Sequence, residues 1–205
     1  MTASILSARP LGAQLGVVLG VVGFWAFAGV GADRQPGYDP ATDYLSSLAG
    51  RGAVEPGWGL AMLASAIVAV LAAALRVRSP LLVVAAVSLT VAGVFRVDCP
   101  AGAAGCNAGP LVVEPGVTGQ VHSAAVVGYQ VFFSAAMLHL AWRCRQVGRC
   151  RAAVAALAGA LVPLVLAGDP LPLDPGVSQR LWVASGQAVL LMLAFWPAGR
   201  ATVAE

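Results

Sequence analysis

Charged residues are scarce in this chain, and lysine is absent. Asp, Glu and Arg together make up 10% of the 205 residues, whereas a soluble domain carries roughly 25% charged residues. This scarcity excludes an ordinary soluble globule and a disordered chain. The formal net charge of +3 is too small to indicate a polyanionic partner, so a nucleic-acid binder is excluded as well.

Familiar catalytic and metal-binding motifs are also missing. The sequence contains no phosphate-binding glycine loop with lysine, no HExxH, no GxSxG, no CxxC and no lipidation motif. Its two histidines, His122 and His139, fall about 25 Å apart on one predicted helix, so they cannot share a metal ion or a haem. We therefore expect no metal site and no cofactor.

What the chain has in excess is apolar sequence. Hydrophobic residues account for 59% of the chain, and its mean hydropathy is +0.83. An apolar stretch of about 18 or more residues can cross a bilayer core of roughly 30 Å, and it must be helical there to satisfy its backbone hydrogen bonds. Six stretches approach or exceed that length, and they predict an all-α fold: an integral membrane six-helix bundle that forms a single transmembrane domain over residues 1–205. They are residues 11–30, 57–75, 80–96, 121–142, 152–168 and 177–196.

The distribution of arginine predicts how the bundle lies in the membrane. Eight of the twelve arginines fall on one side of the predicted spans, and eight of the nine acidic residues fall on the other. Cytoplasmic loops of membrane proteins are enriched in basic residues. We therefore expect both termini in the cytoplasm and a multi-pass protein of the inner (plasma) membrane. The eight arginines are Arg9, Arg76, Arg78, Arg143, Arg145, Arg149, Arg151 and Arg200.

The first span has a second interpretation. Arg9, the apolar run after it and the small residues at 28–32 are also typical of a cleavable signal peptide. Cleavage would leave five helices and an N-terminus outside the cell. The alternative is a retained helix, in which Gly16, Gly20 and Gly23 form a small-residue face suited to close helix packing.

Several residues in and between the spans predict local structure. Residues 43–49 predict a short interfacial helix that Thr42 or Asp43 caps and Gly50 ends. Pro163 falls inside the fifth span and is expected to kink it. Tryptophans fall at the predicted ends of spans, as in the aromatic belts of membrane proteins; these are Trp58, Trp142, Trp182 and Trp196.

The four cysteines divide between the two sides. Cys99 and Cys106 lie on the predicted outer side, where thiols are oxidised, so we expect a disulfide between them. Cys144 and Cys150 lie on the predicted cytoplasmic side, where we expect both thiols to stay reduced.

Ionisable residues near the membrane core are costly, and they therefore mark candidate sites. The predicted topology places Asp43, Asp98, His122 and Arg180 in one outer layer, with Ser46 on the short helix. In one interpretation Asp98 orients His122 as a catalytic acid–base pair, while Asp43, Ser46 and Arg180 bind the headgroup of a ligand. In the other, the same residues form a network of ion pairs and caps that holds the loops to the bundle.

Four short motifs occur in order along the chain: Asp43-Tyr44-Leu45-Ser46-Ser47-Leu48, Phe95-x-x-Asp98, His122 and Gly176-x-x-x-Arg180. In these motifs the chain resembles the domain of unknown function 998 family of small prokaryotic membrane proteins, from about residue 11 to residue 197. The resemblance implies a six-helix bundle and no established chemistry. Arg96 departs from the family, which commonly has proline there, and the loop between Cys99 and Cys106 is an elaboration.

Three classes of function remain open. The first is a non-catalytic membrane protein with a polar pocket at the outer leaflet, which binds a lipid, such as one with an isoprenoid or acyl chain, or a membrane partner. The second is a membrane-embedded enzyme that acts on a lipid or isoprenoid substrate through Asp98 and His122. The third is a small transporter, which is the least favoured because no charged residue is predicted near the bilayer midplane and no paired broken helices occur.

Overall fold

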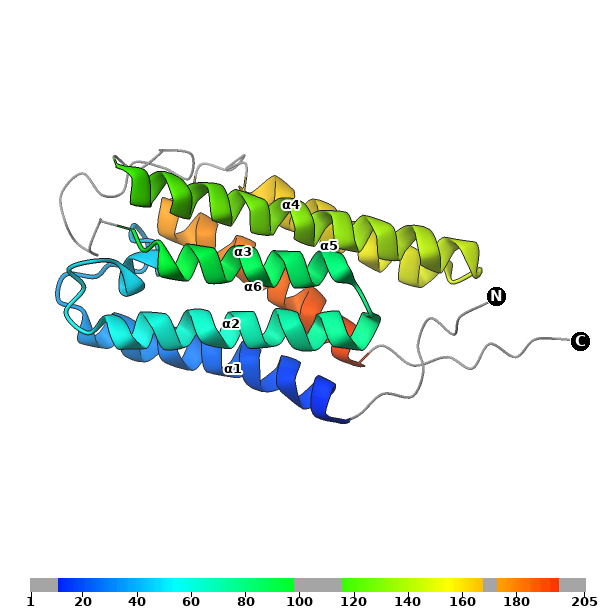
Figure 1. Ribbon diagram of the computed structural model, residues 1–205, viewed down its shortest axis with the longest axis horizontal. Coiled ribbons are helices and arrows are strands. Elements are labelled where there is room, and N and C mark those ends of the chain that lie inside the picture. The colour runs from blue at the N-terminus through cyan, green and yellow to red at the C-terminus, as the bar shows by residue number, and fades with distance from the viewer. Residues whose placement is uncertain (1–10, 98–115, 168–172, 196–205) are drawn as a thin grey trace, which may run out of the picture.

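Six α-helices and one short 3₁₀-helix make up the computed structural model, which describes residues 11–97, 116–167 and 173–195. The α-helices run side by side in one elongated bundle (Figure 1). The predicted all-α, six-helix fold is therefore confirmed. The elements are α1 (Leu11–Arg34), η1 (Leu45–Ala49), α2 (Pro56–Val77), α3 (Pro80–Val94), α4 (Val117–Gln146), α5 (Cys150–Ala167) and α6 (Pro175–Phe195).

Each helix packs on the next one along the chain, and α6 returns to contact α1 and α2. The amide of Gln14 on α1 strengthens this closure by donating a hydrogen bond to the carbonyl of Ala194 on α6, at 3.0 Å. The bundle has two ends. At the loop end, α1 and α3 finish and α2, α4 and α6 begin, whereas the turn end holds the tight α2–α3 and α4–α5 turns (Figure 1). The helix α5 runs toward the loop end alongside the longer α4 and stops short of it (Figure 1).

The bounds of several elements differ from those predicted. α4 has 30 residues and begins four residues earlier than expected, whereas α3 stops at Val94. The element predicted over 43–49 is a 3₁₀-helix over Leu45–Ala49, with Tyr44 rather than Thr42 or Asp43 at its N-cap position. The proline at the first position of α2, α3 and α6 explains why these three starts are well defined, since proline fixes φ at a helical value.

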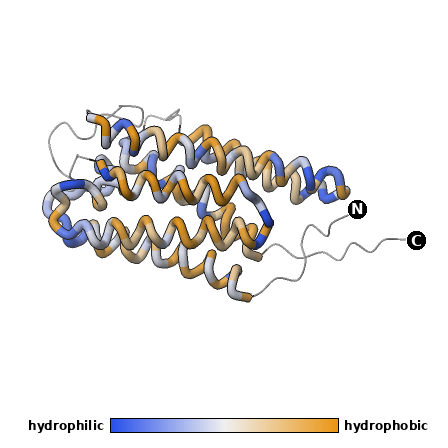
Figure 2. Tube along the Cα trace, viewed as in Figure 1, coloured by the Kyte–Doolittle hydropathy of each residue, from blue (hydrophilic) through white to orange (hydrophobic). Residues whose placement is uncertain are grey.

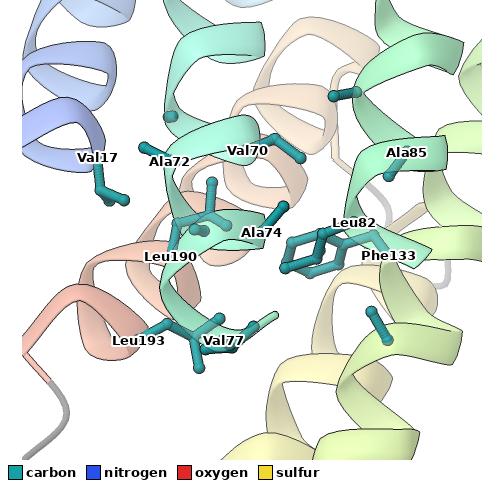
Figure 3. Packing of buried hydrophobic residues seen from close by; sticks show 14 of the residues in the cluster. Val17, Val70, Ala72, Ala74, Val77, Leu82, Ala85, Phe133, Leu190 and Leu193 are labelled. Carbon is teal, nitrogen blue, oxygen red and sulfur yellow. The ribbon is translucent and has the colours of Figure 1, made fainter. Parts of the chain in front are cut away.

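The distribution of side chains is the reverse of that in a soluble protein. Alanines such as Ala69, Ala73 and Ala85 fill much of the interior, together with a few larger residues (Figure 3). Large apolar side chains point outward instead; Leu19 is 65% exposed and Leu75 is 66% exposed. Polar residues gather at the two ends and apolar ones fill the length between them (Figure 2). This arrangement is stable in lipid, where small residues allow close packing and large apolar residues face hydrocarbon.

Three helices of the described residues are long and apolar enough to cross a membrane, namely α1, α2 and α4. The apolar helix α3 and the segment Arg151–Leu166 of α5 are shorter than a full span. A multi-pass membrane protein is thus consistent with the fold.

Glycines set the distance between α1 and α2. A Cβ atom on Gly20 would lie 2.6 Å from the carbonyl oxygen of Ser65 and 2.7 Å from the nitrogen of Ala69. A Cβ atom on Gly16 would lie 2.9 Å from that of Ala72. The predicted small-residue face is therefore where α1 approaches the backbone of α2.

We expect Gly20→Ala to destabilise the bundle by about 1–3 kcal/mol, the usual range for overpacking a tight contact. Gly29→Ala is the matched control, because Gly29 lies on the same helix with no atom within 4 Å of its Cβ position. Thermal unfolding of both variants in detergent measures the difference. Equal melting temperatures for the two variants would contradict the close contact between α1 and α2.

Candidate functional site

Asp43 closes the loop that follows α1. It is 1% exposed, and its Oδ2 accepts a hydrogen bond from the backbone N–H of Asp39, at 2.8 Å. In return the backbone N–H of Asp43 donates to the carbonyl of Asp39, at 2.7 Å. The carboxylate therefore caps the turn before η1 rather than η1 itself, which has no side-chain cap.

Arg180 ties this loop to α6. Its Nη1 donates to the carbonyl of Asp43 at 3.0 Å and to that of Gly176 at 2.8 Å, and its Nη2 donates to the hydroxyl of Tyr38. The guanidinium also lies over the Tyr38 ring, 5.6 Å from the centroid, a favourable cation–π geometry. We call Tyr38, Asp43, Gly176 and Arg180 the Arg180 clamp. The structure thus brings the predicted residues Asp43 and Arg180 together, through a backbone carbonyl.

Gly176, the first residue of the Gly176-x-x-x-Arg180 motif, is required for steric reasons. A Cβ atom on Gly176 would lie 2.6 Å from the carbonyl oxygen of Ala41 and 2.7 Å from that of Asp43, so only glycine allows α6 to begin against the loop. The N–H of Val177 then donates to the carbonyl of Ala41, at 3.1 Å. The first turn of α6 therefore meets the loop through its backbone.

The 3₁₀-helix η1 is held between α1, α2 and α6. Leu45 and Leu48 are buried against an apolar cluster from α1 and α2, and the backbone N–H of Leu45 donates to Oε1 of Gln179, at 2.6 Å. The hydroxyl of Ser47 donates to the carbonyl of Tyr44, at 2.5 Å. Ser46, predicted as a binding residue, is half-buried beside them.

His122 binds the end of α3. Its Nδ1 lies 2.9 Å from the carbonyl oxygen of Ala92 and 3.1 Å from that of Phe95. Carbonyls only accept hydrogen bonds, so Nδ1 must carry the proton, and it supplies a donor to carbonyls that the end of a helix leaves unmatched. Nε2 makes no hydrogen bond to the described residues. Asp98, its predicted partner, lies outside them.

Arg96 is a candidate that our sequence analysis did not place in the site. It follows Phe95 directly and is half-buried, and its side chain makes no hydrogen bond or ion pair with any residue that the structure describes. The adjacent Val97 is anchored, since its carbonyl accepts a hydrogen bond from the backbone N–H of Arg51 at 2.8 Å. The departure from the family at position 96 was the signal that pointed to this residue.

A chain of hydrogen bonds crosses the interior from α6 to α5. The indole N–H of Trp182 donates to Oε1 of Gln130 at 2.6 Å, and the amide of Gln130 donates to the hydroxyl of Ser134 at 3.0 Å. Ser134 then donates to the carbonyl of Ala160 at 3.2 Å. Trp182, predicted in an aromatic belt, thus directs its N–H into the bundle because Gln130 offers an acceptor there.

Ser134 reaches α5 beside its proline. Pro163 lies inside this helix and cannot donate to the carbonyl four residues earlier, that of Gly159. The next carbonyl is the one that accepts from Ser134. Ser134 therefore contacts the helix one residue beyond the carbonyl that loses its donor.

The predictions about the cysteines and about metal ligands can be compared with the described residues. Cys99 and Cys106 lie outside the described residues, as does the disulfide predicted between them. Cys144 is a buried free cysteine. Within residues 11–97, 116–167 and 173–195, no three His, Cys, Asp or Glu side chains gather as metal ligands would.

We expect Arg180→Gln to destabilise the protein by about 1.5–3 kcal/mol, the range for a hydrogen bond to a charged group, because the loop then loses its attachment to α6. Arg34→Gln is the matched control, since Arg34 forms only an exposed ion pair with Glu55, at 3.8 Å. Thermal unfolding and limited proteolysis of the loop measure the effect. A loss no larger than that of the control would contradict the clamp.

Alkaline pH should destabilise the loop around the Arg180 clamp. Burial raises the pKa of Tyr38 above its usual 10.0, although the charge of Arg180 and its hydrogen bond oppose the shift. Because the pKa is higher in the folded state, the stabilisation is complete below the unfolded pKa and is lost as pH rises through the folded one. Between about pH 9 and about pH 11, around the tyrosine pKa, we expect the melting temperature of Tyr38→Phe to fall less than that of the wild type. An equal fall would contradict this role.

Comparison with known proteins gives one match. A family described as "Protein of unknown function (DUF998)" matches residues 18–196, which is most of the chain and includes all four motifs. The match confirms the resemblance found in those motifs. No curated protein and no solved structure matches the chain.

Proposed function

The chain belongs to the DUF998 family of proteins of unknown function, and we propose that it is a six-span protein of the plasma membrane that binds an anionic lipid headgroup at its loop end. In this proposal both termini are cytoplasmic and the loop end faces outward. In this proposal the protein binds a ligand without modifying it, and membrane lipids surround the bundle.

Six spans are supported by the bundle as a whole. The helices α3, α5 and α6 lie alongside α1, α2 and α4, and they expose large apolar residues of their own, such as Val87, Leu161 and Leu181. Retention of α1 is supported by its close contact with α2 through Gly16 and Gly20. Without α1, a face of α2 built for backbone contact would be left open.

The outward orientation of the loop end is supported by charge. Six arginines lie at the turn end, and basic residues favour the cytoplasmic side. The acidic residues of the described chain lie at the loop end instead, with Asp33, Asp39, Asp43, Glu55 and Asp174 among them. The six arginines are Arg76, Arg78, Arg143, Arg145, Arg149 and Arg151.

The observation that carries the binding proposal is the contrast between Arg180 and the pair Arg96 and His122. Arg180 uses its donors on the protein's own carbonyls and on Tyr38. Arg96 has no partner among the described residues, and His122 is fixed through Nδ1 alone. Guanidinium groups bind phosphate through paired, charge-assisted hydrogen bonds, and Nε2 is the ring nitrogen of His122 that the described residues leave available. Both groups lie where α3 ends, the level at which headgroups lie.

The rest of the loop end would then act as a support. Asp43 and Arg180 hold the loop in place, and Ser46 lies beside them. The acyl or isoprenoid chain of the lipid would lie on the outer faces of α3 and α4, where Val94 and Val127 are exposed. We favour a lipid over a protein partner because the flanking surfaces are those of membrane-facing helices.

Retention of lipid by purified protein tests the proposal. In nanodiscs or detergent with phosphatidylglycerol, we expect Arg96→Gln and His122→Gln each to weaken binding by roughly tenfold or more, since a hydrogen bond to a charged group contributes about 1.5–3 kcal/mol. Native mass spectrometry counts the bound lipid. Arg34→Gln, at the same end, should leave binding unchanged, and phosphatidylcholine, whose zwitterionic headgroup has no net charge, should bind equally weakly to all variants.

Equal retention of phosphatidylglycerol by the two variants and by the wild type would contradict the lipid site. A protein that co-purifies with the wild type and is lost from both variants would instead indicate a membrane partner at this position.

An enzyme remains a second candidate because of one observation. A histidine held through Nδ1 with Nε2 unbonded is the arrangement of a general base, and His122 has it. In this alternative His122 and the predicted Asp98 act on a lipid or isoprenoid substrate. Comparison of cellular lipids separates the two candidates: an enzyme changes the amount of one lipid species in a way that His122→Gln abolishes, whereas a binding protein does not.

A further inference from the structure

One buried amide in the middle of the bundle has no partner in the part of the chain that the structure describes. Gln187 on α6 is 7% exposed, and its Oε1 is buried without a hydrogen-bond donor. By helical rise it lies about 18 Å from the start of α6 and about 12 Å from its end. An amide without a partner at such a depth is strongly unfavourable.

Several other polar groups in the bundle interior are matched. Trp182, Gln130 and Ser134 form the continuous chain described above, and Gln14 reaches Ala194. The amide of Gln187 makes no hydrogen bond to any described residue. The missing donor must therefore come from outside the described residues.

A second polar group lies at the same level of α6. The hydroxyl of Tyr129 is 3.8 Å from the Cβ position of Gly186, the residue before Gln187. The Tyr129 ring is positioned by its neighbours, with centroids 5.7 Å from Phe133 and 6.4 Å from Trp182. Its hydroxyl makes no hydrogen bond within the described segments.

We propose that one water molecule is bound inside the bundle, where it donates to Oε1 of Gln187 and bonds to the hydroxyl of Tyr129. Water is small, uncharged, and both donor and acceptor, which matches an amide and a phenol. Buried waters of this kind usually make two to four hydrogen bonds to groups that the protein leaves unmatched.

Infrared spectroscopy of the full chain in nanodiscs tests this site. A buried water gives a narrow O–H stretching band that shifts when the sample is transferred to ¹⁸O-labelled water. We expect the wild type to show such a band, and we expect Gln187→Met and Tyr129→Phe each to lose it. Ser88→Ala is the control and should keep the band, because the Ser88 hydroxyl bonds only to its own helix, at the carbonyl of Val84.

The melting temperature gives an independent reading. If water satisfies the amide, Gln187→Met removes a satisfied interaction and lowers the melting temperature. If the amide is truly unmatched, the same substitution removes a penalty and raises it. A higher melting temperature, or a wild-type spectrum without the ¹⁸O-sensitive band, would overturn the proposal even if one variant failed to fold.

Discussion

The scarcity of water inside an apolar bundle is the constraint on which this structure depends, because each buried polar group then needs a partner within the bundle, either from the protein or from a bound water. Among the described contacts, one way of satisfying such groups occurs several times. The side chains of Gln14, His122, Ser134 and Arg180 each donate to a backbone carbonyl of a neighbouring element. The carbonyls that accept from Gln14 and His122 lie at the ends of α6 and α3, where a helix cannot supply its own donors.

The same constraint explains the size of the residues that pack the bundle. Lipid gives large apolar side chains no reason to turn inward, so van der Waals contact between closely spaced helices and polar contacts must hold them together. Glycine at positions 16 and 20 brings α1 onto the backbone of α2, and glycine at 176 brings α6 onto the loop. Together these contacts fix the loop end in place, at the end of the bundle where α3 stops and where Arg96 and His122 lie.

The sequence predicted the six helices and the small-residue face of α1, since both depend on local composition and spacing. It placed Asp43 and Arg180 in one layer, and the structure joins them. It could not predict that the contact uses a carbonyl, because backbone acceptors have no signature in sequence. The inward direction of Trp182 was missed for a different reason: its acceptor, Gln130, is distant in the sequence, and only the fold brings the two side chains together. Arg96 drew notice only as a departure from the family.

Membrane topology tests most directly whether the loop end of the bundle faces outward. Gly37 at the loop end and Gly148 at the turn end form a matched pair, since both have positive φ and neither has an atom near its Cβ position. A reporter enzyme that is active only outside the cytoplasm can be inserted after each of them in the full chain. If the loop end faces outward, the reporter is active after Gly37 and inactive after Gly148. Activity after Gly148, or equal activity at both positions, would contradict a bundle whose loop end faces outward.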